Sequence, residues 1–256
     1  MLANLEGIQV LPSPRRVHCH SLGCFRHCTE VLRIGDAIEI LDRLSSDLDA
    51  RHLAMQSLLH HGASLRPYIA ALLDIGQRDP ALVHVVLCKL VRQEASMAHH
   101  VIWRAWSHGY HGIVSCLIGT LDEDTRREIE DSRTWATALE TMLAEHGPTP
   151  SGNVCLPGCH DLIIREVLRD QIYTISDSVS QPTVVPVILV DQTTGEQQVR
   201  YLLYKRGKLI FRDIACMDCT RILSTAFMEH TGTAVPVVMY HTVQLEHGGL
   251  LLMVPN

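Results

Sequence analysis

Residues 151–170 (SGNVCLPGCHDLIIREVLRD) mark the point at which the pattern of the sequence changes. Before them, apolar residues recur every three or four positions, which is the period of an amphipathic helix. After them, short apolar runs alternate with turn sequences, which is typical of strands. The segment GPTPSGN (147–153), which overlaps the start of this stretch, contains two prolines and two glycines and therefore predicts a linker. This stretch thus predicts a boundary between a helical half and a β-rich half.

Residues 30–147 are predicted to form an α-helical domain. The segment VLRIGDAIEILDRL (31–44) places Val31, Ile34, Ile38 and Leu41 on one helix face. The pair Asp79-Pro80 predicts a helix start, since Asp caps free backbone N–H groups and Pro is tolerated in the first turn. The recurrence of short helices favours either a short-helix bundle or an array of α-hairpins.

Residues 154–256 are predicted to form an α+β domain with a mostly antiparallel sheet. A helix is expected to start at Cys159, and a second one at ACMDCTRILSTAFMEH (215–230). Pro186 and Pro236 fall inside strand-like runs and predict edge strands or strand starts, because proline cannot donate to a ladder. Strands are expected at TVVPVILV (183–190), QVRYLLY (198–204), LIFRD (209–213), AVPVVMYHTVQL (234–245) and LLLMVP (250–255).

The overall composition excludes several classes of protein. The formal net charge is −6 without a basic block, which argues against a nucleic-acid partner. Apolar runs stay shorter than about 18 residues, so no membrane span is expected. The basic pair near the N-terminus follows the apolar part, which is the wrong order for a secretory signal. The nine cysteines are therefore expected to be reduced thiols of an intracellular protein, in the cytoplasm, the nucleus or both.

Zinc is the cofactor that the sequence suggests. Residues 1–29 are predicted to be an extended arm that carries a Cys/His cluster, VHCHSLGCFRHC (17–28). Zinc takes four nitrogen or sulfur ligands in a tetrahedron, and short Cys/His spacings around a glycine can supply them. The candidate ligands in this arm are His18, Cys19, Cys24 and Cys28.

A second candidate zinc site combines two segments of the C-terminal half. Cys216 and Cys219 form a C-x-x-C pair, and Cys155, Cys159 and His160 offer further ligands. This combination would complete a four-ligand site across the α+β domain.

The same thiols are also candidates for nucleophilic catalysis. A helix N-terminus stabilises a thiolate, so Cys159, at its predicted helix start, is the first candidate and Cys155 the second. His241 is the candidate base and Asn256 the group that would orient its imidazole. This order of thiol, histidine and asparagine resembles papain-like cysteine peptidases, a resemblance that implies a hydrolase or deamidase acting on a protein.

Two short segments are similar to another family of thiol hydrolases. GNVC (152–155) and LIFRD (209–213) are similar to the deubiquitinase domain of herpesvirus large tegument proteins, although Ala215 stands where that family has histidine.

Three functions are compatible with these patterns. The leading expectation is a non-enzymatic adaptor of viral or effector type that acts by protein–protein contact, because the C-terminal strands are unusually apolar. The alternatives are the papain-like hydrolase or deamidase and a zinc-stabilised structural protein. The sequence leaves the partner and the oligomeric state open.

Overall fold

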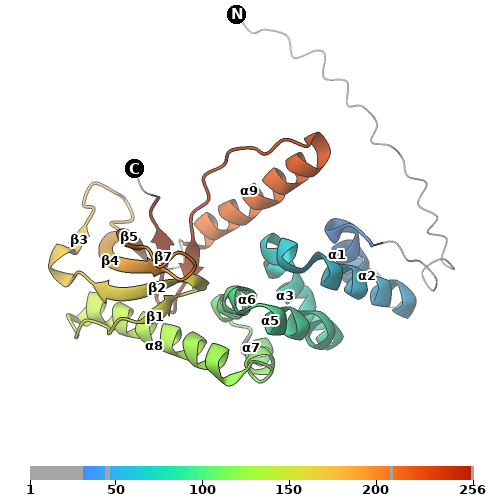
Figure 1. The fold of residues 1–256 in the computed structure, drawn as a ribbon, viewed down its shortest axis with the longest axis horizontal. Helices are drawn as coiled ribbons and strands as arrows, with labels where there is room; N and C mark the ends of the chain where they lie inside the picture. Colours follow the sequence, from blue (N-terminus) through green and yellow to red (C-terminus); the bar gives the residue numbers. More distant parts are fainter. Residues whose placement is uncertain (1–30, 44–46, 208–209, 255–256) are drawn as a thin grey trace, which may run out of the picture.

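The computed structural model describes residues 31–43, 47–207 and 210–254 (Figure 1). Its first part is helical, as the sequence predicts, and its second part is an antiparallel sheet with one long helix. The helical elements of the first part are α1 (Ile34–Arg43), α2 (Leu48–His61), η1 (Gly62–Tyr68), α3 (Ile69–Arg78), α4 (Pro80–Leu82), η2 (Val83–Leu87), α5 (Cys88–Gln93), α6 (Ala95–Ser107), α7 (His111–Ile118) and α8 (Glu123–Glu145).

The helices α1 to α7 share one apolar core. Leu58, Leu72, Leu87, Ile102 and Leu117 are fully buried in it, one from each of five elements. The predicted helix start at Asp79-Pro80 is confirmed, since the Asp79 carboxylate accepts a hydrogen bond from the backbone N–H of Ala81. Burial of a continuous apolar stripe therefore orders these short helices, which would be only marginally stable alone.

The sheet is antiparallel throughout, in the order β1-β2-β4-β5-β7-β6, with β3 paired to β4. Strands β4 and β5 form its central pair. The strands are β1 (Val154–Leu156), β2 (Cys159–Val167), β3 (Tyr173–Thr174), β4 (Thr183–Asp191), β5 (Gln197–Arg206), β6 (Thr242–Gln244) and β7 (Gly248–Leu252). A short 3-10 turn, η3 (Arg169–Gln171), lies between β2 and β3.

The prediction that Pro186 marks an edge strand or a strand start is wrong, because it lies inside β4 between two partner strands. One side of β4 pairs with β3 up to Val184 and with β2 from Val187 onward. Pro186 falls between these two pairings, where a missing N–H costs no ladder bond. Its carbonyl still accepts a hydrogen bond from Leu168.

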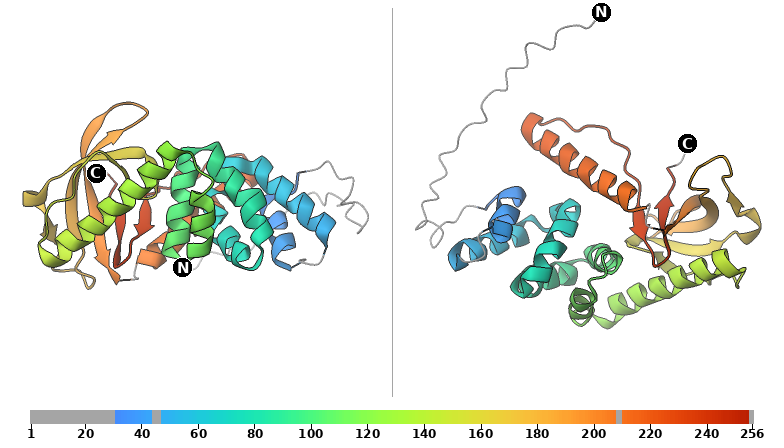
Figure 2. Two further views of the ribbon diagram at one scale, coloured as in Figure 1. Left: turned by 90° about the horizontal axis from the view of Figure 1, so that it is seen from below. Right: turned by 180° about the vertical axis from the view of Figure 1, so that it is seen from behind.

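Helix α8 lies along one face of the sheet (Figure 2) and forms a second apolar core with it. Trp135 and Leu139 of α8 contact the sheet in this core, which Trp103 of α6 also joins. A buried polar contact accompanies it, because Glu140 accepts hydrogen bonds from the Tyr204 hydroxyl and from the backbone N–H of His247. Since a lone buried carboxylate would be costly, these donors make its burial tolerable.

Three predicted elements are wrong. The helix expected at Cys159 is strand β2, because Pro157-Gly158 forms a tight hairpin turn with Gly158 at φ 73° instead of a helix start. The strand expected at 209–213 is the beginning of helix α9 (Ile210–Thr231). Of the strand expected at 234–245, only β6 is present, and Pro236 lies in the irregular stretch before it.

Helix α9 stands between the helical part and the sheet, and its far end projects from the body of the molecule (Figure 1). Arg104 of α6 and Asp218 of α9 form an ion pair at this junction, with side chains 8% and 18% exposed. This buried contact fixes α9 to the helical part.

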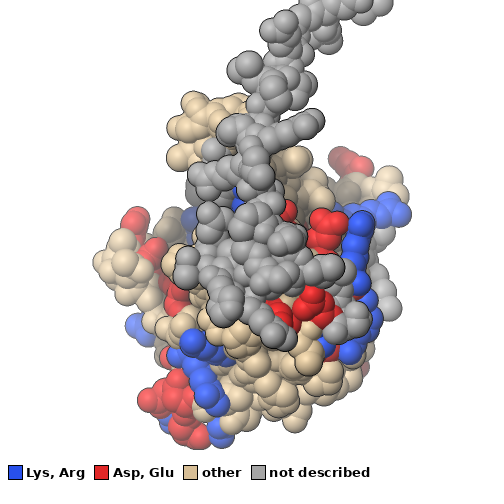
Figure 3. Space-filling model, turned by 90° about the vertical axis from the view of Figure 1, so that its right-hand side faces the viewer, with Lys and Arg blue, Asp and Glu red and all other residues tan. Residues whose placement is uncertain are grey.

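The described surface is mixed in charge. On the face shown in Figure 3, basic and acidic side chains are interspersed. Ion pairs such as Arg78–Asp42 and Arg43–Glu39 bring opposite charges together on the helical part. Within the described ranges, no helix combines the length and the apolar character that crossing a membrane requires.

Candidate metal centre

Four side chains with metal-binding atoms meet where α6 and α8 contact the first hairpin of the sheet. They are His99 of α6, Glu128 of α8, Cys155 of β1 and His160 of β2. Their candidate ligand atoms all lie within 4.8 Å of one another. Each residue comes from a different element, so tertiary packing alone assembles the group.

The hairpin between β1 and β2 brings Cys155 and His160 together. Leu156 pairs with Cys159 across the Pro157-Gly158 turn, and an irregularity follows at once, so that Cys155 pairs with Ile163. Bulges of this kind re-aim side chains and are common next to functional sites. Here the irregular register leaves His160 beside Cys155, facing α8.

The two histidines lack the hydrogen bonds that buried imidazoles usually make. The His99 side chain is fully buried, and neither of its ring nitrogens has a hydrogen-bond partner among the described residues. Nδ1 of His160 is likewise without one. Buried polar atoms are nearly always satisfied, so a group left unpaired requires an explanation, and an absent ion is one. The orphaned nitrogens lie beside a thiol and a carboxylate, as ligation requires.

The distances between the ligand atoms are compatible with a tetrahedral ion. Nitrogen and oxygen ligands at about 2.0–2.1 Å from zinc lie about 3.4 Å from one another in a tetrahedron. Oε2 of Glu128 is 3.3 Å from Nδ1 of His160 and 3.7 Å from Nε2 of His99. These two distances are therefore close to the edges of a zinc tetrahedron, and the other ligand atoms lie within 4.8 Å.

Burial sets the protonation state of the free ligands. It lowers the pKa of His99 to about 3, with a further contribution from His160, so the imidazole is neutral as a metal ligand must be. Burial raises the pKa of Cys155 to about 12, and the Glu128 carboxylate adds to this rise. A bound cation would lower the pKa of the Cys155 thiol, because its charge stabilises the thiolate.

Gln192 supports the cysteine from the turn after β4. Its side-chain amide donates to the Cys155 sulfur at 3.7 Å and to the backbone carbonyl of His160. A donor to the sulfur holds the first hairpin in place and stabilises negative charge on the thiolate.

Of the two thiols expected to act as nucleophiles, one is buried and the other is half-buried. Cys155 is 5% exposed, and Cys159 is half-buried in a strand, where burial raises its pKa. Cys159 therefore lacks the helix N-terminus on which its predicted activation rested. Neither thiol is hydrogen-bonded to His241, whose Nε2 instead lies 2.7 Å from the carbonyl oxygen of Pro157.

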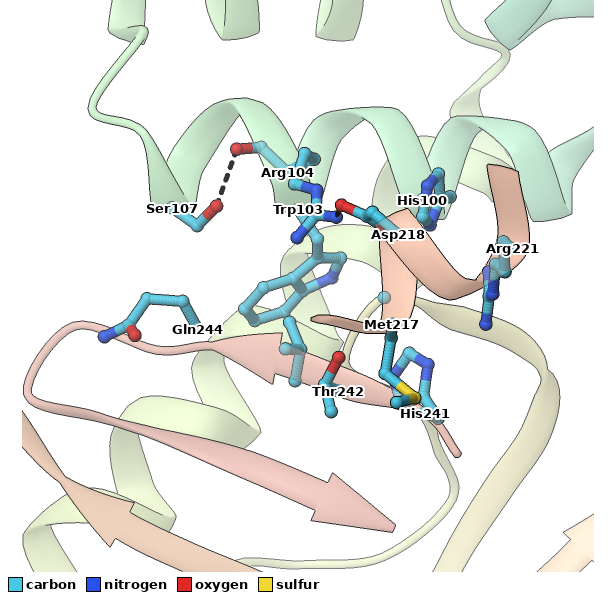
Figure 4. Close-up of a pocket in the computed structure, with 12 residues that line it drawn as sticks. His100, Trp103, Arg104, Ser107, Met217, Asp218, Arg221, His241, Thr242 and Gln244 are labelled. Carbon is cyan, nitrogen blue, oxygen red and sulfur yellow. Dashed lines mark hydrogen bonds and ion pairs between the residues drawn. The ribbon is translucent and has the colours of Figure 1, made fainter. Parts of the chain in front are cut away.

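His241 lines a separate small cavity with Arg104 and Asp218 (Figure 4). Burial lowers the pKa of His241 to about 4. The pocket is partly open to solvent and offers about 40 Å³ of space, which suffices for a few water molecules.

The other predicted site residues fall into two groups, those outside the described residues and those exposed on α9. His18, Cys19, Cys24, Cys28 and Asn256 lie outside the described residues. Cys216 and Cys219 are exposed on α9, and the group that surrounds Cys155 and His160 contains neither of them.

Of the four candidate ligands, the sequence predicts Cys155 and His160 but neither His99 nor Glu128. The signal for His99 was its place in the apolar helix MAHHVIWRAW (97–106), where a buried imidazole needs a partner. Glu128 lies in a strongly charged segment and gave no such signal.

Compared with known proteins, the chain matches no protein-family model and no curated protein sequence.

Proposed function

We propose that this chain is a zinc-stabilised protein in which His99, Glu128, Cys155 and His160 bind a structural ion. The observation that carries the proposal is the fully buried His99 ring with two unpaired nitrogens, within ligand distance of a thiol, a carboxylate and a second imidazole. Imidazole and thiolate ligands select zinc and similar transition metals over magnesium or calcium.

The number and place of the ligands favour a structural role over a catalytic one. Structural zinc sites use four protein ligands, whereas catalytic sites use three and keep one position for water. Four donors are present here. They belong to α6, α8, β1 and β2, so an ion held by them would fasten the helical part to the edge of the sheet.

Metal analysis of the purified full-length chain tests this proposal. We expect His99→Leu and Cys155→Ser each to lower the zinc content by one ion per chain relative to the unchanged protein. The exposed thiol of Cys219 provides the matched control, and Cys219→Ser is expected to retain all of the zinc. Each variant is compared with the unchanged chain, so an ion held elsewhere, including by residues 17–28, contributes equally to both and does not affect the difference in zinc content. Equal zinc content in the unchanged chain and both ligand variants would refute the proposal.

Protein–protein contact is the second function that we propose. Leu223 and Phe227 of α9 are one helical turn apart and are 69% and 47% exposed. Val238, in the irregular stretch after α9, is 64% exposed. Apolar side chains that gather on one projecting element are more typical of an interaction surface than scattered ones are.

A comparison of pull-downs tests this second function. We expect the Leu223→Lys/Phe227→Lys variant to lose a partner that the unchanged chain captures from its native cell. A Leu48→Lys variant is the control, because Leu48 is 74% exposed on a different helix, α2. If every captured protein is retained by the α9 variant, then α9 is not the contact surface.

A further inference from the structure

A second group of soft ligands lies in the helical part, away from the sheet. Cys88 is the first residue of α5, Cys116 belongs to α7, and His84 belongs to η2. The two sulfurs are 3.7 Å apart, and Nδ1 of His84 lies 3.7 Å from the sulfur of Cys116. Cys88 is buried, Cys116 is half-buried and His84 is exposed.

These distances match the edges of a zinc tetrahedron. With zinc–sulfur and zinc–nitrogen bonds of about 2.3 and 2.05 Å, two sulfurs lie about 3.8 Å apart, and a sulfur and a nitrogen about 3.6 Å apart. A disulfide is the alternative for two neighbouring thiols, but its S–S bond of about 2.05 Å is much shorter than the observed separation. A disulfide would also leave the adjacent imidazole without a role.

The local backbone supports the grouping. The segment Val83–Leu87 is a π-helical turn, in which the N–H of Cys88 bonds to the carbonyl of Val83, five residues back. Single π-turns inside helices are rare and occur frequently at functional sites. His84 and Cys88 are four residues apart on this continuous helix and therefore share one face, opposite Cys116 of α7.

We propose that His84, Cys88 and Cys116 form a second zinc site with three protein ligands and one coordination position open to solvent. The exposed His84 lies on the outer side of the group, so the fourth position faces water. An open position distinguishes this site from the closed group at His99, because it can take a water molecule or an external nitrogen or sulfur ligand. The proposal does not depend on the zinc-stabilised function proposed above.

Metal content and cobalt spectra of the full chain test the second site. We expect Cys88→Ser/Cys116→Ser to lose one zinc per chain relative to the unchanged protein. With Co²⁺ in place of zinc, the thiolate-to-cobalt absorption of the unchanged chain should decrease in this variant, because two thiolate ligands are removed. Added imidazole should shift the cobalt bands of the unchanged chain but leave those of the double variant unaltered.

A surface variant keeps the test decisive if loss of the buried thiol impairs folding. His84→Ala alters an exposed side chain, and we expect it to weaken zinc binding at this site by at least 10-fold in chelator competition. Loss of a residue that only hydrogen-bonds to a metal ligand already costs about 10-fold in affinity, so loss of a ligand should cost at least as much. His111→Ala, an exposed histidine on α7, is the control and should have no effect. Unchanged zinc affinity and content in both site variants would overturn the proposal, as would a Cys88–Cys116 disulfide in zinc-treated protein.

Discussion

Removal of zinc by a chelator is expected to lower the free energy of unfolding by about 4 kcal/mol, if zinc is present at about a thousandfold excess over its dissociation constant. For a chain of this size, that change corresponds to a fall in Tm of roughly 10 °C. The physical reason is that His99 is fully buried without a hydrogen bond among the described residues, so a bound ion would compensate for its desolvation. Thermal unfolding with and without chelator, followed by return of zinc, measures the effect.

The His99→Leu variant provides the control for this result. Leucine has no nitrogen atoms to satisfy, so without zinc the variant should be more stable than the unchanged chain, by about 1–3 kcal/mol. With zinc, the unchanged chain should be more stable than the variant, because only the unchanged chain gains the free energy of zinc binding at this site. If the chelator lowers Tm equally in both proteins, the stabilising ion is bound elsewhere. Hydrogen exchange localises the effect, since the amides of β1 and β2 should lose protection first.

The substitution Asp218→Ala is expected to cost about 3–5 kcal/mol of stability, the second large effect. Arg104 is 8% exposed and pairs with Asp218, so the substitution leaves a buried guanidinium without its counter-charge. The neighbouring Arg221 increases the cost, because it lowers the pKa of Arg104 by repulsion, after the larger contribution of burial. Guanidinium-induced unfolding measures the change.

The reverse substitution, Arg104→Ala, is expected to cost less than Asp218→Ala. Asp218 keeps a favourable charge nearby, since Arg221 also lowers the pKa of that carboxyl against the raising effect of burial. The double variant Arg104→Met/Asp218→Leu should be close to the unchanged chain, because apolar replacements of similar size remove both desolvation penalties. If the two single variants lose the same free energy of unfolding, Arg221 does not distinguish the stability of the remaining Asp218 from that of the remaining Arg104.

The predicted fold class is confirmed, and the errors concern individual elements. The period of three to four residues identified the helical half because it records which face of each helix is buried. The segment at 209–213 was assigned as a strand because its residues favour strands, but Ile210 is buried against Gly249 of β7 as the first residue of α9. Tertiary contact outweighed local preference there, as it commonly does for short apolar segments.

The order of residues is enough to predict where the period changes, which segments are apolar and how closely Cys155 and His160 are spaced along the chain. These features depend on neighbours within a few residues, so local physics is sufficient to predict them. The grouping of His99 and Glu128 with them follows from packing, since each is carried on a separate element and the four side chains meet only where α6 and α8 contact the first hairpin. A site assembled from separate elements has no spacing in the sequence, because its distances are set by packing.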